Sequence, residues 1–183
     1  MARATRATRM LDAAGVAFTV ESYAYDRDAD HVGLQAAEAL GQPPEQVLKT
    51  LMALVDGRPA IAIVPSDREV AMKKLAAALG GKAARMMQPA DAERLSGYKV
   101  GGISPFGQPR PLPTAIEQAA FVHPFVYING GQRGLQVRLA PAMPHACSPR
   151  SPRRLSPDGR YSTVTLFARL RGWSTSVPLA TAT

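Results

Sequence analysis

A glycine-rich stretch carries the backbone groups best suited to bind a carbonyl or phosphate oxygen. It runs from Gly97 to Gly107 and reads Gly-Tyr-Lys-Val-Gly-Gly-Ile-Ser-Pro-Phe-Gly. Adjacent glycines followed by a proline disfavour both a helix interior and a central strand, so we expect a shaped loop. Gly101 and Gly102 lack a Cβ, and their N–H groups can therefore approach an oxygen closely. A pair of ordinary tight turns is the alternative.

A second stretch of the same kind is Asn129-Gly130-Gly131-Gln132-Arg133-Gly134, and it lies between two apolar runs. An Asn-Gly pair in that setting is typical of a β-hairpin turn. From spacing alone, a turn is favoured over a binding loop.

Lys49 is the third candidate, because it interrupts the apolar run Val47–Val55. Its stem has to cross buried surface, and its ammonium group offers three donors suited to a terminal phosphate or an ester carbonyl. The neighbouring Thr50 could add a hydroxyl. The alternative is a lysine whose stem packs on apolar surface while its charge reaches solvent.

Together the two glycine-rich stretches and the segment from Gln46 to Leu51 resemble, in order and spacing, the YbaK/EbsC family of aminoacyl-tRNA deacylases. The resemblance extends from about Thr5 to about Leu139. It implies an α/β fold of the α+β type, with a mixed, partly barrel-like central sheet surrounded by helices. The implied activity is removal of cysteine mischarged on proline tRNA. The implied partners are the 3′ aminoacyl end of that tRNA and a prolyl-tRNA synthetase in a ternary complex, without a cofactor.

The resemblance also implies residue roles. Lys49 would hold the 3′-terminal nucleotide and would form the catalytic set with Gly101 and Gly102. The substrate-binding set would comprise Tyr23 at the rim, Thr50, Ile103, Ser104, Pro105 and, on a facing wall, Asn129, Gly130, Gly131 and Arg133.

The chemistry implied by the resemblance is assisted by the substrate: the thiolate of the misattached cysteine attacks its own ester carbonyl. The family often has serine where Asn129 stands and aspartate where Gln136 stands. The second difference removes a charge, so deacylation is more firmly indicated than preference for cysteine. Two alternatives stay open, namely editing of another small amino acid such as alanine and a non-catalytic tRNA-binding or regulatory module.

Neither a metal site nor a protein nucleophile is indicated by the sequence. His31, His123 and His145 share no metal-ligand spacing, and no Cys-x-x-Cys or Gly-x-Ser-x-Gly motif occurs. The single cysteine, Cys147, predicts an unreactive thiol and a reducing, cytoplasmic location.

Apolar periodicity and turn residues predict the elements that position these groups. We expect helices at about 3–14, 32–40, 69–79 and 90–95, and strands at 16–21, 47–55, 60–64, 83–87, 125–128 and 135–139. Ser66 or Asp67 should cap the third helix. Arg3, Arg6 and Arg9 share one side of the first helix, which indicates a solvated face rather than an RNA-binding stripe. Helices and strands without a strict repeat predict a mixed sheet.

The chain of 183 residues carries a net charge of +8 that is unevenly distributed. Residues 1–140 hold 16 Lys/Arg against 13 Asp/Glu, whereas residues 141–183 hold 6 against 1. We expect one editing domain over 1–140, large enough for a core. Residues 141–183 form an atypical basic, Pro/Ser/Arg-rich tail, predicted to be poorly ordered and hypothesised to be foreign to the domain. No apolar run reaches the roughly 18 residues of a membrane span.

Overall fold

The structure, a computed structural model, describes residues 4–26 and 32–141. Its elements in chain order are α1 (Arg6–Ala13), β1 (Phe18–Ser22), α2 (Val32–Leu40), β2 (Val47–Val55), β3 (Arg58–Pro65), α3 (Met72–Ala78), β4 (Ala84–Met86), α4 (Pro89–Ser96), β5 (Thr114–Ile116), the 3-10 helix η1 (Gln118–Val122), β6 (Val126–Asn129) and β7 (Leu135–Leu139). The predictions for His31, His145, Cys147 and the tail from residue 142 onward lie outside these residues.

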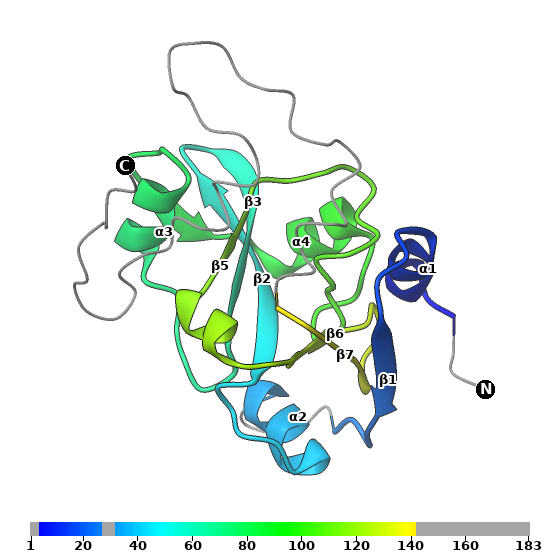
Figure 1. Cartoon of the computed structure of the whole chain (residues 1–183). Helices are drawn as coiled ribbons and strands as arrows, with labels where there is room; N and C mark the ends of the chain where they lie inside the picture. The colour runs from blue at the N-terminus through cyan, green and yellow to red at the C-terminus, as the bar shows by residue number, and fades with distance from the viewer. Residues whose placement is uncertain (1–3, 27–31, 142–183) are drawn as a thin grey trace, which may run out of the picture.

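The seven strands form one mixed sheet in the order β1-β7-β6-β2-β3-β5, and β4 pairs with β2 beside this path. The β2–β6 and β3–β5 pairs are parallel, and the other pairs are antiparallel. Figure 1 shows the helices distributed around this sheet, with α3 and α1 on opposite sides of the molecule and α2 at its lower end. The predicted mixed sheet with surrounding helices is confirmed. None of the described helices is long and apolar enough to cross a membrane.

The β2–β3 hairpin forms at the predicted place for a local reason. Asp56 and Gly57 both have positive φ, 47° and 78°, as a two-residue turn that matches strand twist requires. The flanking strands are almost continuously apolar, and Leu48, Ile61 and Ile63 are buried within the largest core cluster. Each such side chain contributes roughly 1.5–3 kcal/mol on burial.

The predicted start of the third helix is wrong. Helix α3 begins at Met72, and its N-cap, Ala71, makes no side-chain cap bond. Ser66 cannot cap it, because its N–H still donates to the Val47 carbonyl at the end of the β2–β3 ladder and its hydroxyl donates to Pro44.

Arg6 is exposed, as predicted for the solvated face of the first helix, but its guanidinium also makes specific contacts. Its guanidinium lies 4.4 Å from the centre of the Tyr98 ring and donates to the carbonyls of Ser96 and Gly97. Helix α1 is thereby attached to the start of the first glycine-rich loop.

Strand β2 has an interval without a neighbour on one edge. On its first edge it pairs with β3 from Leu48 to Val55. On its second edge it pairs with β6 at Val47 and Leu48, and with β4 only from Ala53 onward. The Met52 carbonyl accepts from the Met87 N–H just beyond β4, so residues 49–51 face a break between β6 and β4, and the candidate site occupies this break.

Candidate active site

A pocket of about 260 Å³ opens at the unpaired interval of β2. A space of this size suits a small organic group, since pockets for drug-sized ligands span about 300–1,000 Å³. It is lined by Ala36, Val47, Leu48, Lys49, Thr50, Leu51, Met52, Ser66, Met86, Met87, Pro89, Ala92, Val100, Gly101, Ile103, Asn129 and Gln136. The predicted residues Lys49, Thr50, Gly101, Ile103 and Asn129 are thus brought together.

Lys49 is the only charged residue among the described residues that line the pocket. Its Nζ donates to the Ser66 carbonyl at 3.1 Å, which fixes the ammonium group while leaving two donors. Burial lowers the pKa of Lys49, and the nearby carboxylates of Glu69 and Asp67 oppose that shift. The site therefore holds one partly desolvated cation.

The first glycine-rich loop contributes backbone donors at two of its predicted positions. Gly101 and Ile103 line the pocket, and neither N–H group has an acceptor among the described residues. Gly102 differs, because its N–H donates to the Lys99 carbonyl at 2.8 Å. A Cβ on Gly102 would stand 2.8 Å from the Arg133 backbone nitrogen. Gly102 thus allows the two glycine-rich loops to pack and does not present a donor.

The second glycine-rich loop supports the first. Asn129 Nδ2 donates to the Gly101 carbonyl at 3.1 Å, and Asn129 Oδ1 accepts from the Gly131 N–H at 2.8 Å. Arg133 Nε donates to the Val100 carbonyl at 2.7 Å. Of the residues predicted for the facing wall, Asn129 lines the pocket, while Gly131 and Arg133 contact the loop that does.

Several predicted substrate-binding residues do not line the pocket: Tyr23, Ser104, Pro105, Gly130, Gly131 and Arg133. Ser104 is fully buried, and its hydroxyl accepts from the Phe106 N–H inside the turn. Tyr23 packs in a small apolar cluster with Tyr127, and burial raises the pKa of its phenol. Tyr25, which the sequence did not single out, lies against Gly101 instead, since a Cβ there would meet its hydroxyl at 2.8 Å.

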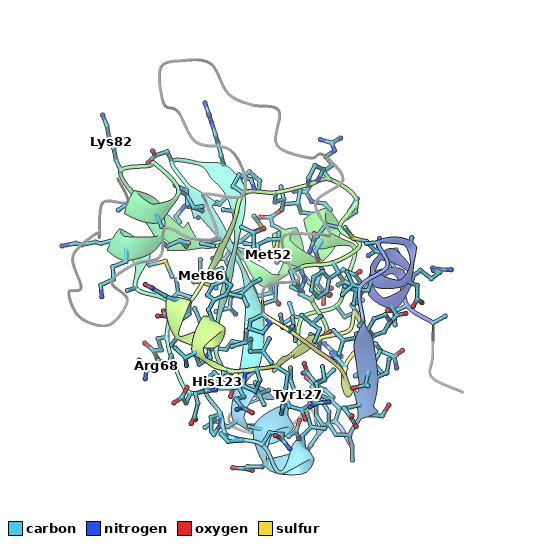
Figure 2. All side chains as sticks on the ribbon, viewed as in Figure 1. Met52, Arg68, Lys82, Met86, His123 and Tyr127 are labelled. Atoms are coloured by element: carbon cyan, nitrogen blue, oxygen red, sulfur yellow. The ribbon has the colours of Figure 1, made fainter. Side chains whose placement is uncertain are left out.

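Sequence reasoning missed the methionine side of the pocket. Met52 belongs to β2, whereas Met86 and Met87 come from β4 and the residue after it. Figure 2 shows Met52 and Met86 near the centre of the molecule. Methionine is flexible and polarisable, so this wall can adapt to a small side chain. The pairing of β4 with β2, which delivers Met86, depends on distant residues and left no local signal.

The lining residues suit stabilisation of a developing oxyanion. A cation and free backbone N–H groups, held in a partly dry pocket, act most strongly on charge that forms during a reaction. The described lining residues include no Asp, Glu, His or Cys. No group of three or more metal-ligating side chains occurs in the described part of the chain.

Comparison with known proteins points to one family. Residues 28–144 match the model of the aminoacyl-tRNA editing domain. A protein of Enterococcus faecalis with the provisional name Cys-tRNA(Pro)/Cys-tRNA(Cys) deacylase EbsC is 33% identical over 139 residues, which are 75% of this chain and 84% of that protein. A proline–tRNA ligase of Nitratidesulfovibrio vulgaris is 34% identical over 77 residues, which are 42% of this chain and 13% of the ligase.

Solved structures agree on the fold. A crystal structure described as a candidate trans-editing enzyme for prolyl-tRNA synthetase superposes with a TM-score of 0.68 at 22% identity, covering 80% of this chain and 91% of that one. The family match covers more than half of the chain, and the EbsC relative is matched over most of its length. The chain therefore belongs to the aminoacyl-tRNA editing domain family of the YbaK/EbsC type that its loop motifs predicted.

Proposed function

We propose that the protein is a trans-editing deacylase that removes cysteine mischarged on proline tRNA. The observation that carries the proposal is the pocket itself, which brings together Lys49, Gly101 and Ile103 and has no Cys, His, Asp or Glu among its described lining residues. The name of the Enterococcus faecalis relative supports cysteine as the amino acid. An aminoacyl ester is already activated, so positioning and oxyanion stabilisation suffice for its cleavage.

The substrate supplies the nucleophile in this mechanism. The cysteine thiolate attacks its own ester carbonyl carbon, a C–S bond forms, and the C–O bond to the terminal ribose breaks. The ribose oxygen takes up a proton and the tRNA leaves, while the cyclic thioester is opened by water. Lys49 holds the 3′-terminal nucleotide, and the amides of the first loop bind the carbonyl oxygen as it gains charge.

The substrate is the 3′ end of a mischarged tRNA, presented in the cytoplasm alone or by prolyl-tRNA synthetase. Such a step is needed because a synthetase pocket rejects a near-isosteric amino acid by only about 1–3 kcal/mol. Editing by a separate protein then deacylates the mischarged tRNA that the synthetase releases.

The test measures release of cysteine and of alanine from proline tRNA with the protein at substoichiometric concentration. We expect multiple turnovers on the cysteinyl ester and slower release of alanine, which lacks the thiol. If alanine is released faster than cysteine, alanine is the preferred amino acid and the proposed specificity for cysteine is wrong. Binding of tRNA without release would support a non-catalytic module instead.

A further inference from the structure

Two residues that line the pocket each have a buried side-chain oxygen with no hydrogen-bond donor in the described part of the chain. Thr50 Oγ1 and Gln136 Oε1 are both shielded from solvent and unpartnered. Thr50 is 8% exposed and Gln136 is 4% exposed, and both residues line the pocket. A buried acceptor without a donor costs about 1–3 kcal/mol, so these positions favour a ligand that supplies N–H or O–H groups.

The backbone of Thr50 adds a third acceptor on the same strand. The Val47 carbonyl accepts from Ser66 on the β3 side, whereas the Met52 carbonyl accepts from the Met87 N–H on the other edge. Because successive residues of a strand direct their backbone groups to alternate edges, the Thr50 carbonyl points to the same edge as that of Met52. Neither β6 nor β4 pairs with β2 at Thr50. Its carbonyl is therefore directed into the break that the pocket occupies.

Gln136 reaches the pocket from the other side of β6. It lies opposite Asn129 in the β6–β7 ladder, and β6 in turn pairs with β2 at Leu48. The side-chain amide of Gln136 also faces the Tyr23 phenol, where hydrogen bonding lowers the pKa of that phenol against the larger effect of burial. The carbonyl oxygen of this amide has no donor among the described residues.

We propose that Thr50 and Gln136 accept hydrogen bonds from the α-amino group of the aminoacyl ester. This inference rests on the proposed function, because only an aminoacyl substrate brings that group. The amino group donates in both its charged and its neutral form, and it is the donor-rich part of every aminoacyl ester. Two neutral oxygens bind the uncharged amine without the need for a carboxylate beside Lys49, the single cation of the pocket wall.

The test compares two non-hydrolysable probes, adenosine carrying a 3′-amide-linked cysteine and the same compound with 3-mercaptopropanoyl, which lacks the amino group. Calorimetric titration of the wild-type protein should show about tenfold tighter binding of the amino compound. Thr50→Val and Gln136→Leu should each reduce that preference to about threefold or less, with binding of the des-amino compound unchanged. Gln35→Leu is the matched control, since Gln35 Oε1 is also buried and unpartnered but Gln35 does not line the pocket.

Thermal unfolding separates recognition from a structural role. Removing an acceptor that has no donor should leave the unfolding midpoint of Thr50→Val and Gln136→Leu unchanged or higher. Lower midpoints together with retained preference would overturn the inference in favour of a packing role.

The inference and the proposed function fail in different ways. Wild-type protein that releases cysteine from tRNA but binds both probes equally would overturn the inference alone. If the wild-type protein binds the amino probe more tightly but releases no amino acid from tRNA, the inference about the amino group stands and the proposed deacylase activity is wrong.

Discussion

The two glycine-rich loops have similar sequences but use their backbone groups differently. In the first loop, Gly101 and Ile103 line the pocket, and their N–H groups have no acceptor among the described residues. In the second loop, the N–H groups of Gly130 and Gly131 donate to the Leu135 carbonyl and to Asn129 Oδ1. The first loop can bind a ligand, while the second is a hairpin turn that holds the first in place. Glycine content alone does not distinguish a binding loop from a supporting one.

A substitution at the contact between the two glycine-rich loops should have the largest effect on stability and deacylation. Gly102→Ala places a Cβ 2.8 Å from the backbone nitrogen of Arg133, and neither loop can yield without moving its main chain. We expect a loss of about 1–3 kcal/mol in the free energy of unfolding and about a hundredfold loss in kcat/KM for deacylation, because small displacements of a donor are costly.

Gly80→Ala is the control for that variant. Gly80 has a φ of +73° and nothing within 4 Å of the added Cβ. It should lose stability through backbone strain and keep its turnover. Equal loss of turnover in both variants would show that the loop contact has no special role.

Loss of the Asn129 hydrogen bond to the first loop should have the next largest effect on catalysis. Asn129→Asp keeps the acceptor for the Gly131 N–H but loses the donor to the Gly101 carbonyl and turns a carboxylate oxygen towards it. We expect about a tenfold fall in kcat, since a charged group then faces an unpaired carbonyl. Stopped-flow or quenched deacylation assays measure this directly. Unchanged kcat with raised KM would place Asn129 in substrate binding and contradict its supporting role.

Titration distinguishes Lys49 from the loop amides, which do not ionise. Burial lowers the pKa of Lys49, so catalysis that needs its charge should fall by about tenfold per pH unit above that pKa, earlier than for a solvent-exposed lysine. The free energy of unfolding should change in the opposite direction. Between the folded and unfolded pKa values the unfolded chain binds more protons, so stability rises with pH. A pH profile that Lys49→Gln leaves unchanged would contradict this assignment.

Arg133 should give the smallest effect. Its guanidinium donates to the Val100 carbonyl and lies 5.5 Å from the centre of the Tyr25 ring. We expect Arg133→Met to lower kcat by about fivefold or less, as for a partly exposed supporting contact of roughly 1 kcal/mol. An increase in KM that depends on salt would instead indicate a phosphate contact.

Local signals in the sequence were sufficient for most of the fold. The apolar run of β2, the Asp56-Gly57 turn and Pro89 at the start of α4 each act over a few residues, and the strands predicted at 47–55 and 60–64 and the helix predicted at 90–95 lie where these signals place them. The start of α3 was not, because Ser66 takes part in the β2–β3 ladder instead of a cap.

The site was predicted only in part, for a related reason. Lys49 and Gly101 lie at the pocket as the motifs indicated, although their roles stay predictions. The unpaired interval of β2 and the methionine wall depend on where β6 ends and β4 begins. Such registers are set by the packing of distant segments, which no local pattern encodes. The extent of the editing domain over 1–140 also stays a prediction.

The most direct test of the account is the rate at which Lys49→Ala releases cysteine from proline tRNA, compared with Lys82→Ala. Lys82 is exposed at the upper edge of the molecule in Figure 2, outside the pocket lining. Lys49 is proposed to position the 3′-terminal nucleotide, and a small misplacement of a substrate can cost about a hundredfold in rate, so Lys49→Ala should lose about a hundredfold in kcat/KM. Lys82→Ala should stay within about twofold of the wild type. Equal rates for the two variants would contradict the assignment of this pocket as the catalytic site.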